Sequence, residues 1–226
     1  MIAGYVTKTY EISDSYKEIQ LKAGDAKVKI EPSDGNKTAL VIFEKKRRPY
    51  EFFINNGTLA IKPAKARWYN FIRIGIDRSE IKLSIPKAML ERITVSSNVG
   101  CVDISSITCR ETVDIQVNTG DMSLENVTCR DVSSQGNTGS VSLNNVTAEK
   151  SITIKRNTGK VLLNDCFAPD IFVKNNTGKV CGRLPSNTAF VVRSNTGKAE
   201  LPKAPIGETI GGRCEIKTNT GRIKFE

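Results

Sequence analysis

Apolar and polar residues alternate through most of residues 92–226, and a glycine recurs between the alternating runs. Before successive glycines the apolar residues lie two apart: Val113, Ile115 and Val117; Ile152 and Ile154; Ile171 and Val173; Phe190 and Val192; Cys214 and Ile216. After the glycines they fill the second and fourth positions: Val102 and Ile104, Met122 and Leu124, Val141 and Leu143, Val161 and Leu163, Ile223 and Phe225. This period of two predicts strands with one buried face, and no convincing helical period competes with it.

The recurring glycines are evenly spaced and most of them close an Asn-Thr-Gly tripeptide. They are Gly100, Gly120, Gly139, Gly159, Gly178, Gly197 and Gly221, at spacings of 20, 19, 20, 19, 19 and 24 residues. Repetition at such a period is the signature of a solenoid. We therefore predict one all-β domain over residues 1–226, a parallel β-helix or solenoid of about nine or ten coils with about 19–20 residues each. Residues 92–226 form its regular part.

The tripeptide is typical of a corner between two strands. Glycine permits a positive φ or a close backbone approach, and asparagine tolerates turn conformations. In coils stacked about 4.8 Å apart the asparagines form a column whose amides can bond from coil to coil. The column comprises Asn98, Asn118, Asn137, Asn157, Asn176, Asn195 and Asn219. Asn126 and Asn145 occupy a second corner of consecutive coils.

Residues 1–91 repeat the alternation less regularly. The run around Gly24 resembles a coil, and Asn56-Gly57 predicts a hairpin between Phe52–Ile54 and Leu59–Ile61. We interpret this part as divergent early coils interrupted by a hairpin that caps the open end, since an uncovered strand edge invites association. An aromatic cluster lies at residues 67–71, and residues 202–212 predict a loop before the final coil.

Composition lowers the expectation of catalysis. The chain carries a net charge of +10 and has no histidine, the residue most often used as a general base and zinc ligand. We expect no enzyme activity, no cofactor and no metal. No apolar run approaches the roughly 18 residues of a membrane span, and the N-terminus lacks a signal-peptide core. The expected location is the cell envelope if an anchor precedes these residues, and otherwise the cytoplasm.

The six cysteines follow the repeat and form no metal-binding pair. They are Cys101, Cys109, Cys129, Cys166, Cys181 and Cys214. Several replace small apolar residues of other coils, which favours buried thiols. A disulfide between Cys109 and Cys129 is the alternative and would require an oxidising compartment.

The Asn-Thr-Gly-x-Val-x-Leu coils, the entry "YEISDSYKEIQLKAGDAKVKIEPSD" and the ending "CEIKTNTGRIKF" resemble a bacterial putative-adhesin family of unknown function with β-strand repeats. The resemblance runs from about residue 10 to the C-terminus. It implies a right-handed β-helix, often held outside the membrane by an anchor, and brings no catalytic residues. Many members have an acidic residue after the corner, where the last four repeats of this chain have lysine or arginine.

Basic residues flank the corners of the last four repeats. One column directly follows the glycines (Lys160, Lys179, Arg222 and Lys198), and another lies two residues before the asparagines (Lys155, Lys174, Lys217 and Arg193), with Arg156 adding to one coil. Like charges on neighbouring strands repel, and the fold does not need them. They are therefore a candidate anion-binding face; the alternative is a solvated basic surface.

The basic columns favour an anionic envelope polymer or lipid head groups as partner, or a protein partner. Nucleic acid is disfavoured, because stacking aromatics are missing between the basic residues. We predict a non-enzymatic adhesin-like or scaffold module of the bacterial envelope. The alternatives are a cytosolic regulatory or assembly protein and, less favoured, a polysaccharide-active enzyme. Such an enzyme needs converging carboxylates, whereas Asp103, Asp114 and Asp121 alternate outward without an evident partner.

Overall fold

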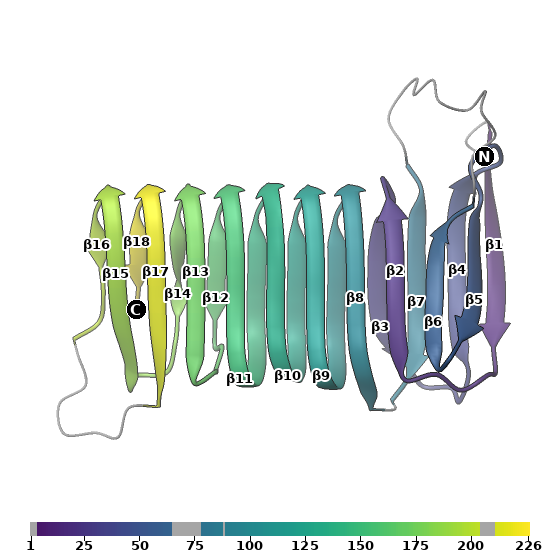
Figure 1. Cartoon of the computed structure of the whole chain (residues 1–226), viewed down its shortest axis with the longest axis horizontal. Helices are drawn as coiled ribbons and strands as arrows, with labels where there is room; N and C mark the ends of the chain where they lie inside the picture. The colour runs from purple at the N-terminus through teal and green to yellow at the C-terminus, as the bar shows by residue number, and fades with distance from the viewer. Residues whose placement is uncertain (1–3, 65–77, 88, 204–210) are drawn as a thin grey trace.

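The chain folds into an all-β, largely parallel structure that is elongated along the stacking direction of its strands (Figure 1). The computed structural model describes residues 4–64, 78–87, 89–203 and 211–226. The aromatic cluster at residues 67–71 and most of the loop at 202–212 lie outside the described residues. Within them, no helix has the length and apolarity to cross a membrane.

The strands form two layers that face each other across the core (Figure 1). The front layer contains β5 (Tyr50–Asn55), β6 (Thr58–Pro63), β2 (Glu18–Gly24), β8 (Leu90–Val99), β13 (Asp170–Thr177), β17 (Gly212–Thr220) and β15 (Thr188–Thr196). The back layer contains β1 (Tyr5–Ile12), β4 (Thr38–Lys45), β7 (Glu80–Pro86), β3 (Lys27–Ser33), β12 (Val161–Asn164), β14 (Val180–Arg183), β18 (Ile223–Phe225) and β16 (Ala199–Glu200). Three long strands run from the back layer into the front: β9 (Val102–Thr119), β10 (Met122–Thr138) and β11 (Val141–Thr158).

Successive repeats pair in parallel and in register, so equivalent residues stack. Met122 faces Val102 on one side and Val141 on the other, and Leu124 faces Ile104 and Leu143. Between the layers each long strand bends at a residue with positive φ, such as Asn126 and Asn145, both at 52°. The predicted second corner is therefore confirmed, and asparagine suits it because this side chain tolerates the left-handed region.

The alternation places the apolar residues between the layers, where they form one continuous core. Ile115, Ile154 and Val173 of the front layer and Leu124, Leu143 and Leu163 of the back layer are all essentially inaccessible to solvent. Burial of these stacked aliphatic side chains stabilises the fold by about 25 cal/mol for each Å² of apolar surface removed from water.

At the C-terminal end, the order of the repeats in space differs from their order in the chain. The last repeat, β17 with β18, lies between β13 with β14 and β15 with β16. In chain order, β15 and β16 come first and form the outermost described repeat. The final repeat, β17 with β18, then occupies the place inside it (Figure 1). The 202–212 segment precedes the final repeat in the chain, as expected, and the pairing places that repeat inside the stack and not at its end.

The N-terminal end combines an inserted coil with an antiparallel cap. Strand β2 pairs with β6 and β8, and β3 pairs with β7 and β9, so the first coil lies inside the stack. Beyond it, β4 pairs antiparallel with β1 and β7, and β5 pairs antiparallel with β6. The predicted hairpin is confirmed: Asn56 and Gly57 have φ of 48° and 75°, as its tight turn requires.

Candidate anion-binding face

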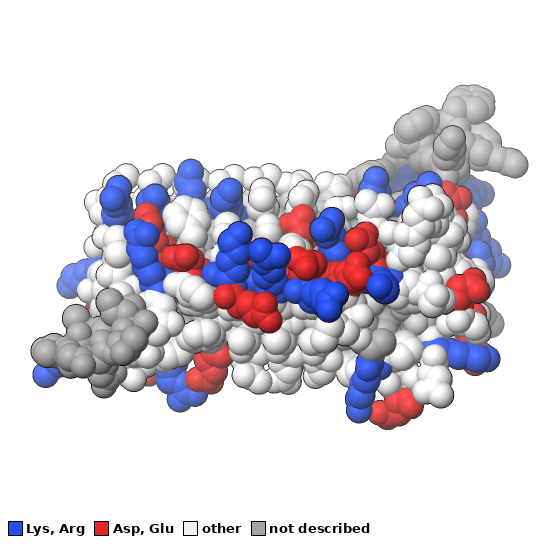
Figure 2. Space-filling view, turned by 60° about the horizontal axis from the view of Figure 1, so that its bottom comes forward, with Lys and Arg blue, Asp and Glu red and all other residues white. Residues whose placement is uncertain are grey.

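The basic residues that precede the asparagines form one outward-facing column on the front layer. Lys155 faces Lys174, Lys174 faces Lys217, and Lys217 faces Arg193 in the parallel register. Figure 2 shows separate lysine and arginine side chains at regular spacing along this edge of the C-terminal half. The column continues into earlier repeats as Gln135, Gln116, Ser96 and Lys22. Its positive charge is therefore concentrated toward the C-terminal end.

The residues directly after the corner glycines form the second column. Backbone hydrogen bonds from the neighbouring repeats fix the spatial order of this column. The carbonyl oxygens that accept them belong, in spatial order, to Lys160, Lys179, Arg222 and Lys198, and the donors are the N–H groups of Val141, Val161, Val180 and Ile223. All four side chains are exposed. The Asn-Thr-Gly corners separate this column from the first, so the two columns border a shared edge of the molecule.

Carboxylates offset the charge at two of the eight positions. Lys217 Nζ lies 2.8 Å from Glu215 Oε1 and 5.1 Å from the centre of the Phe172 ring, and Arg222 Nη2 lies 2.6 Å from Glu200 Oε1. Among the described residues, no salt bridge joins the other six: Lys155, Lys174, Arg193, Lys160, Lys179 and Lys198. The two columns therefore retain most of their positive charge.

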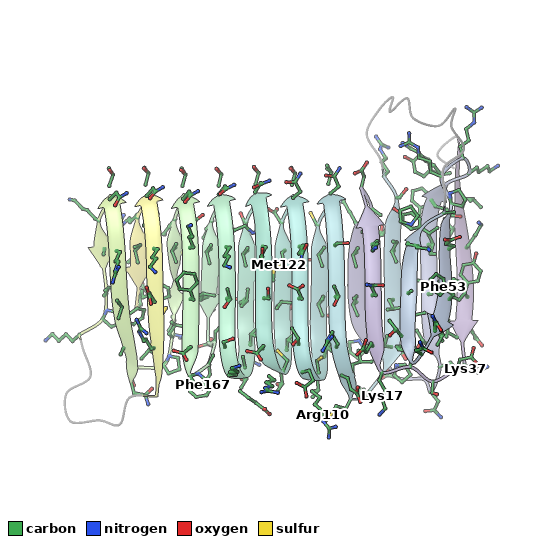
Figure 3. All side chains as sticks on the ribbon, in the orientation of Figure 1. Lys17, Lys37, Phe53, Arg110, Met122 and Phe167 are labelled. Atoms are coloured by element: carbon green, nitrogen blue, oxygen red, sulfur yellow. The ribbon has the colours of Figure 1, made fainter. Side chains whose placement is uncertain are left out.

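The asparagines of the corners hydrogen-bond from repeat to repeat. Asn157 Nδ2 donates to Asn137 Oδ1 at 2.6 Å, Asn176 Nδ2 donates to Asn157 Oδ1 at 2.9 Å, and Asn195 Nδ2 donates to Asn219 Oδ1 at 3.2 Å. Figure 3 shows the resulting row of polar side chains beyond the upper ends of the strands. This asparagine ladder consumes part of the hydrogen-bonding capacity of each amide, which supports a structural role for the tripeptide.

Close contact between adjacent repeats explains why each of these corners has a glycine. Gly120, Gly139, Gly159, Gly178, Gly197 and Gly221 all have positive φ. A Cβ at any of them would collide with the backbone of the corner glycine in the adjacent repeat. A side chain here would therefore separate the stacked coils.

An open groove of about 760 Å³ lies beside the first basic column. Its lining includes the outward residues Gln116, Gln135, Lys155 and Lys174, together with the amides of the asparagine ladder. Cationic and amide donors on an open, elongated surface are suited to binding an extended anion. The sequence predicted the column but gave no signal of the groove.

Arg156 was predicted to add to the basic surface. This prediction is wrong, because its side chain faces the core. It shares its register position with Gly136 and Asn175, and only 2% of its surface is exposed. The same inward position holds Thr218 and Ser194 in the outer repeats. We call Arg156, Asn175, Thr218 and Ser194 the inner polar row. Its signal in the sequence was the polar residue that breaks the apolar alternation directly before Asn157, Asn176, Asn195 and Asn219.

Of the three carboxylates considered for hydrolysis, Asp103 and Asp121 interact with each other, since burial and then the charge of Asp121 raise the pKa of Asp103, whereas Asp114 lies apart from them. Asp103 lies in the back-layer part of β9 and Asp114 in its front-layer part. Asp121 Oδ1 accepts a hydrogen bond from the Ser140 backbone N–H at 2.7 Å. In the described part of the chain, no three histidine, cysteine, aspartate or glutamate residues are grouped to hold a metal ion.

The cysteines are free thiols, and all except the half-buried Cys101 are buried. Burial raises the pKa of Cys129 and of Cys214 to about 12. Thiolates are the reactive form, so these side chains behave as small apolar residues. The structure therefore favours the buried-thiol interpretation over the Cys109–Cys129 disulfide.

Most of the chain matches the model of a known family. The model of the family described as Toastrack DUF4097 matches residues 16–187. No curated protein shows a significant match.

Solved structures provide further likenesses. A putative adhesin from Parabacteroides distasonis ATCC 8503 is 14% identical with a TM-score of 0.52, covering 98% of this chain and 97% of that one. A putative adhesin from Bacteroides fragilis NCTC 9343 is 17% identical with a TM-score of 0.45, covering 99% and 98%. A putative lipid binding protein from Parabacteroides distasonis ATCC 8503 is 16% identical with a TM-score of 0.48, covering 100% and 98%. At these identities the likeness to the first structure establishes a shared fold and nothing about ligands.

Proposed function

Because the chain belongs to the Toastrack DUF4097 family, we propose that it is a non-enzymatic, adhesin-like scaffold module of the bacterial cell envelope. In this proposal the stacked repeats form a right-handed parallel β-solenoid, and the basic face contacts an anionic envelope polymer or lipid head groups. The proposed location is the extracytoplasmic side of the membrane.

The observation that carries the proposal is the assembly of the two basic columns. The side chains of Lys155, Lys174, Lys217 and Arg193 come from strands that lie side by side. Adjacent strands are about 4.8 Å apart, so like charges along the column repel each other. The core is formed by the inward residues and gains nothing from this repulsion. A repeating anion placed along the column removes the repulsion and matches its spacing.

The proposal is tested by sedimentation with lipid vesicles. We expect the chain to bind vesicles that contain phosphatidylglycerol in phosphatidylcholine, and to bind pure phosphatidylcholine weakly. Screening by salt should weaken binding, because the Debye length shortens from about 10 Å at 0.1 M to about 3 Å at 1 M ionic strength. Replacing Lys160, Lys179 and Lys198 with glutamate should weaken binding by at least about tenfold, since each basic residue near an anionic surface contributes about 1 kcal/mol.

A matched control reverses the same charge elsewhere. Lys46, Arg110 and Lys150 are exposed, lie outside both columns and form no salt bridge among the described residues, and their replacement with glutamate changes the net charge equally. This control should retain most of the vesicle binding. Equal losses in both triple variants would mean that net charge, and not the basic face, drives the interaction. Salt-insensitive binding, or none to vesicles and to purified anionic wall polymer, would remove the proposal and favour a protein-assembly role.

A further inference from the structure

Arg156 is a buried charged side chain at a position that the neighbouring repeats fill with uncharged residues, among them Gly136 and Asn175. Its register neighbours on the N-terminal side are Gly136 and, one repeat further, Val117. Arginine stays protonated at physiological pH, so the buried charge costs several kcal/mol unless it is compensated. Burial lowers the pKa of Arg156, and the charge of Asp121 opposes that shift. A residue this costly to bury needs a compensating partner.

Only part of the guanidinium is compensated by the fold. Nη1 donates to the Val117 carbonyl oxygen at 2.9 Å. The group occupies the space that a side chain at Gly136 would take, because a Cβ there would collide with Arg156 Nη1 and with the Val117 oxygen. Two repeats are thus adapted to Arg156: Gly136 provides room, and Val117 provides one acceptor.

The other edge of the guanidinium lacks an acceptor among the described residues. Neither Nε nor Nη2 of Arg156 has a hydrogen-bond partner in the described part of the chain. These two atoms form the fork with which arginine binds a carboxylate or phosphate at two points. Elsewhere in this chain Arg183 uses the same two atoms on Asp165, at 3.0 and 2.8 Å. Arg156 therefore presents a complete oxyanion-binding edge without a carboxylate from the chain.

The inner polar row contains further buried polar atoms that have no hydrogen-bond partner among the described residues. Asn175, the next residue in register, donates through Nδ2 to the Gly159 carbonyl oxygen at 3.0 Å, while its Oδ1 has no described partner. The hydroxyl oxygens of Thr218 and Ser194 likewise lack a described partner. The groove described above is lined by Gly136 and Arg156 as well as by Lys155 and Lys174. The lining of one groove therefore includes Arg156, whose Nε and Nη2 atoms are buried, and the two exposed lysines.

We propose that the groove contains a discrete oxyanion site, in which the Nε and Nη2 atoms of Arg156 bind one phosphate or carboxylate group and Lys155 and Lys174 add charge from the rim. The proposal rests on the anion-binding function proposed above and assigns it a specific anchoring point. The columns attract an extended polyanion along its length, whereas Arg156 fixes one anionic group of it. Because Nε and Nη2 are shielded from water, the proposal requires the groove lining to move locally when the anion binds.

The test follows the thermal unfolding midpoint of the full chain as inorganic phosphate is added at constant ionic strength, with acetate as a second probe. A ligand that binds only the native state raises this midpoint in proportion to ln(1 + [L]/Kd), so the rise against concentration flattens once the ligand exceeds Kd, and saturation is meant in this sense. General salt exclusion from the surface instead raises it steadily without saturation. We expect saturation with at least one of the two probes in the wild-type chain. A purely steady rise, or no rise, with both probes would overturn the proposal.

Two variants test which residues form the oxyanion site. Arg156→Lys retains the charge but removes the fork, and should abolish the saturable part of the rise. Lys155→Gln with Lys174→Gln alters only the rim, and should weaken the apparent affinity severalfold while the saturation persists. Equal saturation in wild type and Arg156→Lys would refute the assignment. Should Arg156→Lys fail to fold, the Nε–H resonance of Arg156 in the wild-type chain gives the same answer: it must shift saturably with the anion.

Different experiments test the Arg156 site and the proposed envelope-binding function, so either can fail alone. Vesicles containing phosphatidylglycerol report on the basic columns, and inorganic phosphate reports on Arg156. Vesicle binding without a saturable phosphate or acetate effect would refute the Arg156 site and leave the envelope-binding proposal standing. A saturable phosphate effect without vesicle binding would keep the site and indicate a free anion, not a lipid head group, as its ligand.

Discussion

Replacement of Gly159 by alanine tests the stacking of the corners most directly. Gly159 has a φ of +149°, and an added Cβ would lie 2.7 Å from the carbonyl carbon of Gly139, closer still to its oxygen. Both neighbours are backbone, so no flexible side chain can move aside. The hydrogen bonds from Gly159 N to Thr177 O and from Gly139 N to Thr158 O, each 3.0 Å long, flank the collision.

The magnitude follows from two contributions. An unfavourable backbone conformation costs about 1–3 kcal/mol. Loosening one or two inter-coil hydrogen bonds adds about 1–2 kcal/mol, because each contributes roughly 1 kcal/mol net. We therefore expect a loss of about 2–5 kcal/mol in the free energy of unfolding. For a chain of this size that corresponds to a fall in the melting temperature of roughly 4–20 °C.

The assay is urea and thermal unfolding followed by far-ultraviolet circular dichroism, with two control glycines. Gly57→Ala places a side chain at a φ of +75° with no atom within 4 Å, so it measures the conformational contribution alone. Gly35→Ala has open space and no such backbone constraint, so it should be nearly neutral. The expected order of destabilisation is Gly159, then Gly57, then Gly35. If Gly159→Ala is no less stable than Gly57→Ala, the close stacking of the corners is refuted.

Three further outcomes can be measured with the same chain. Asn137→Ala removes both of that residue's amide bonds in the asparagine ladder and should cost about 1–2 kcal/mol of stability by urea unfolding; no loss would show that the ladder is incidental. Hydrogen bonds from Lys29 and then Lys82 lower the pKa of Glu31. The folded pKa lies below the unfolded value, so this stabilisation is present above about pH 4.3 and is lost as pH falls through the folded pKa. Glu31→Gln should therefore be less stable than wild type by up to about 1 kcal/mol at pH 7 and similar to it near pH 2, and an equal deficit at both pH values would contradict this. Because burial raises the pKa of Cys129 to about 12, iodoacetamide at pH 8 should alkylate it only after unfolding, as mass spectrometry can follow; rapid native labelling would exclude the buried position.

The repeat, the strands and the family could be predicted from the sequence because each rests on local pattern. Alternation specifies which residues face the core, and the corner tripeptide specifies where the chain turns. The basic columns were also predictable, since residues at equal distance from a repeated glycine must stack when the repeats do. The comparisons with known proteins confirm the family and the all-β fold.

Arg156 shows where that reasoning was insufficient. Charge alone assigned it to the surface beside Lys155, whereas the strand alternation places it one position further and therefore inward. Its burial depends on Gly136 in one neighbouring repeat and on the Val117 carbonyl group in another. Contacts between residues 20 and 39 positions apart are not visible in a local pattern, and neither is the groove above them.

The sequence by itself determined the unit that is repeated, and only the tertiary structure decided the order in which the units stack. All C-terminal repeats share one alternation, so any of them can pair with any other in register. The inserted repeat presents Ile223 and Phe225 to the core, and these side chains are 0% and 4% exposed. The repeat outside it offers Ala199 and Leu201 at the same positions, and Leu201 is 38% exposed. Placing the more apolar repeat inside buries more hydrophobic surface, which is a property of the whole stack and of no single segment.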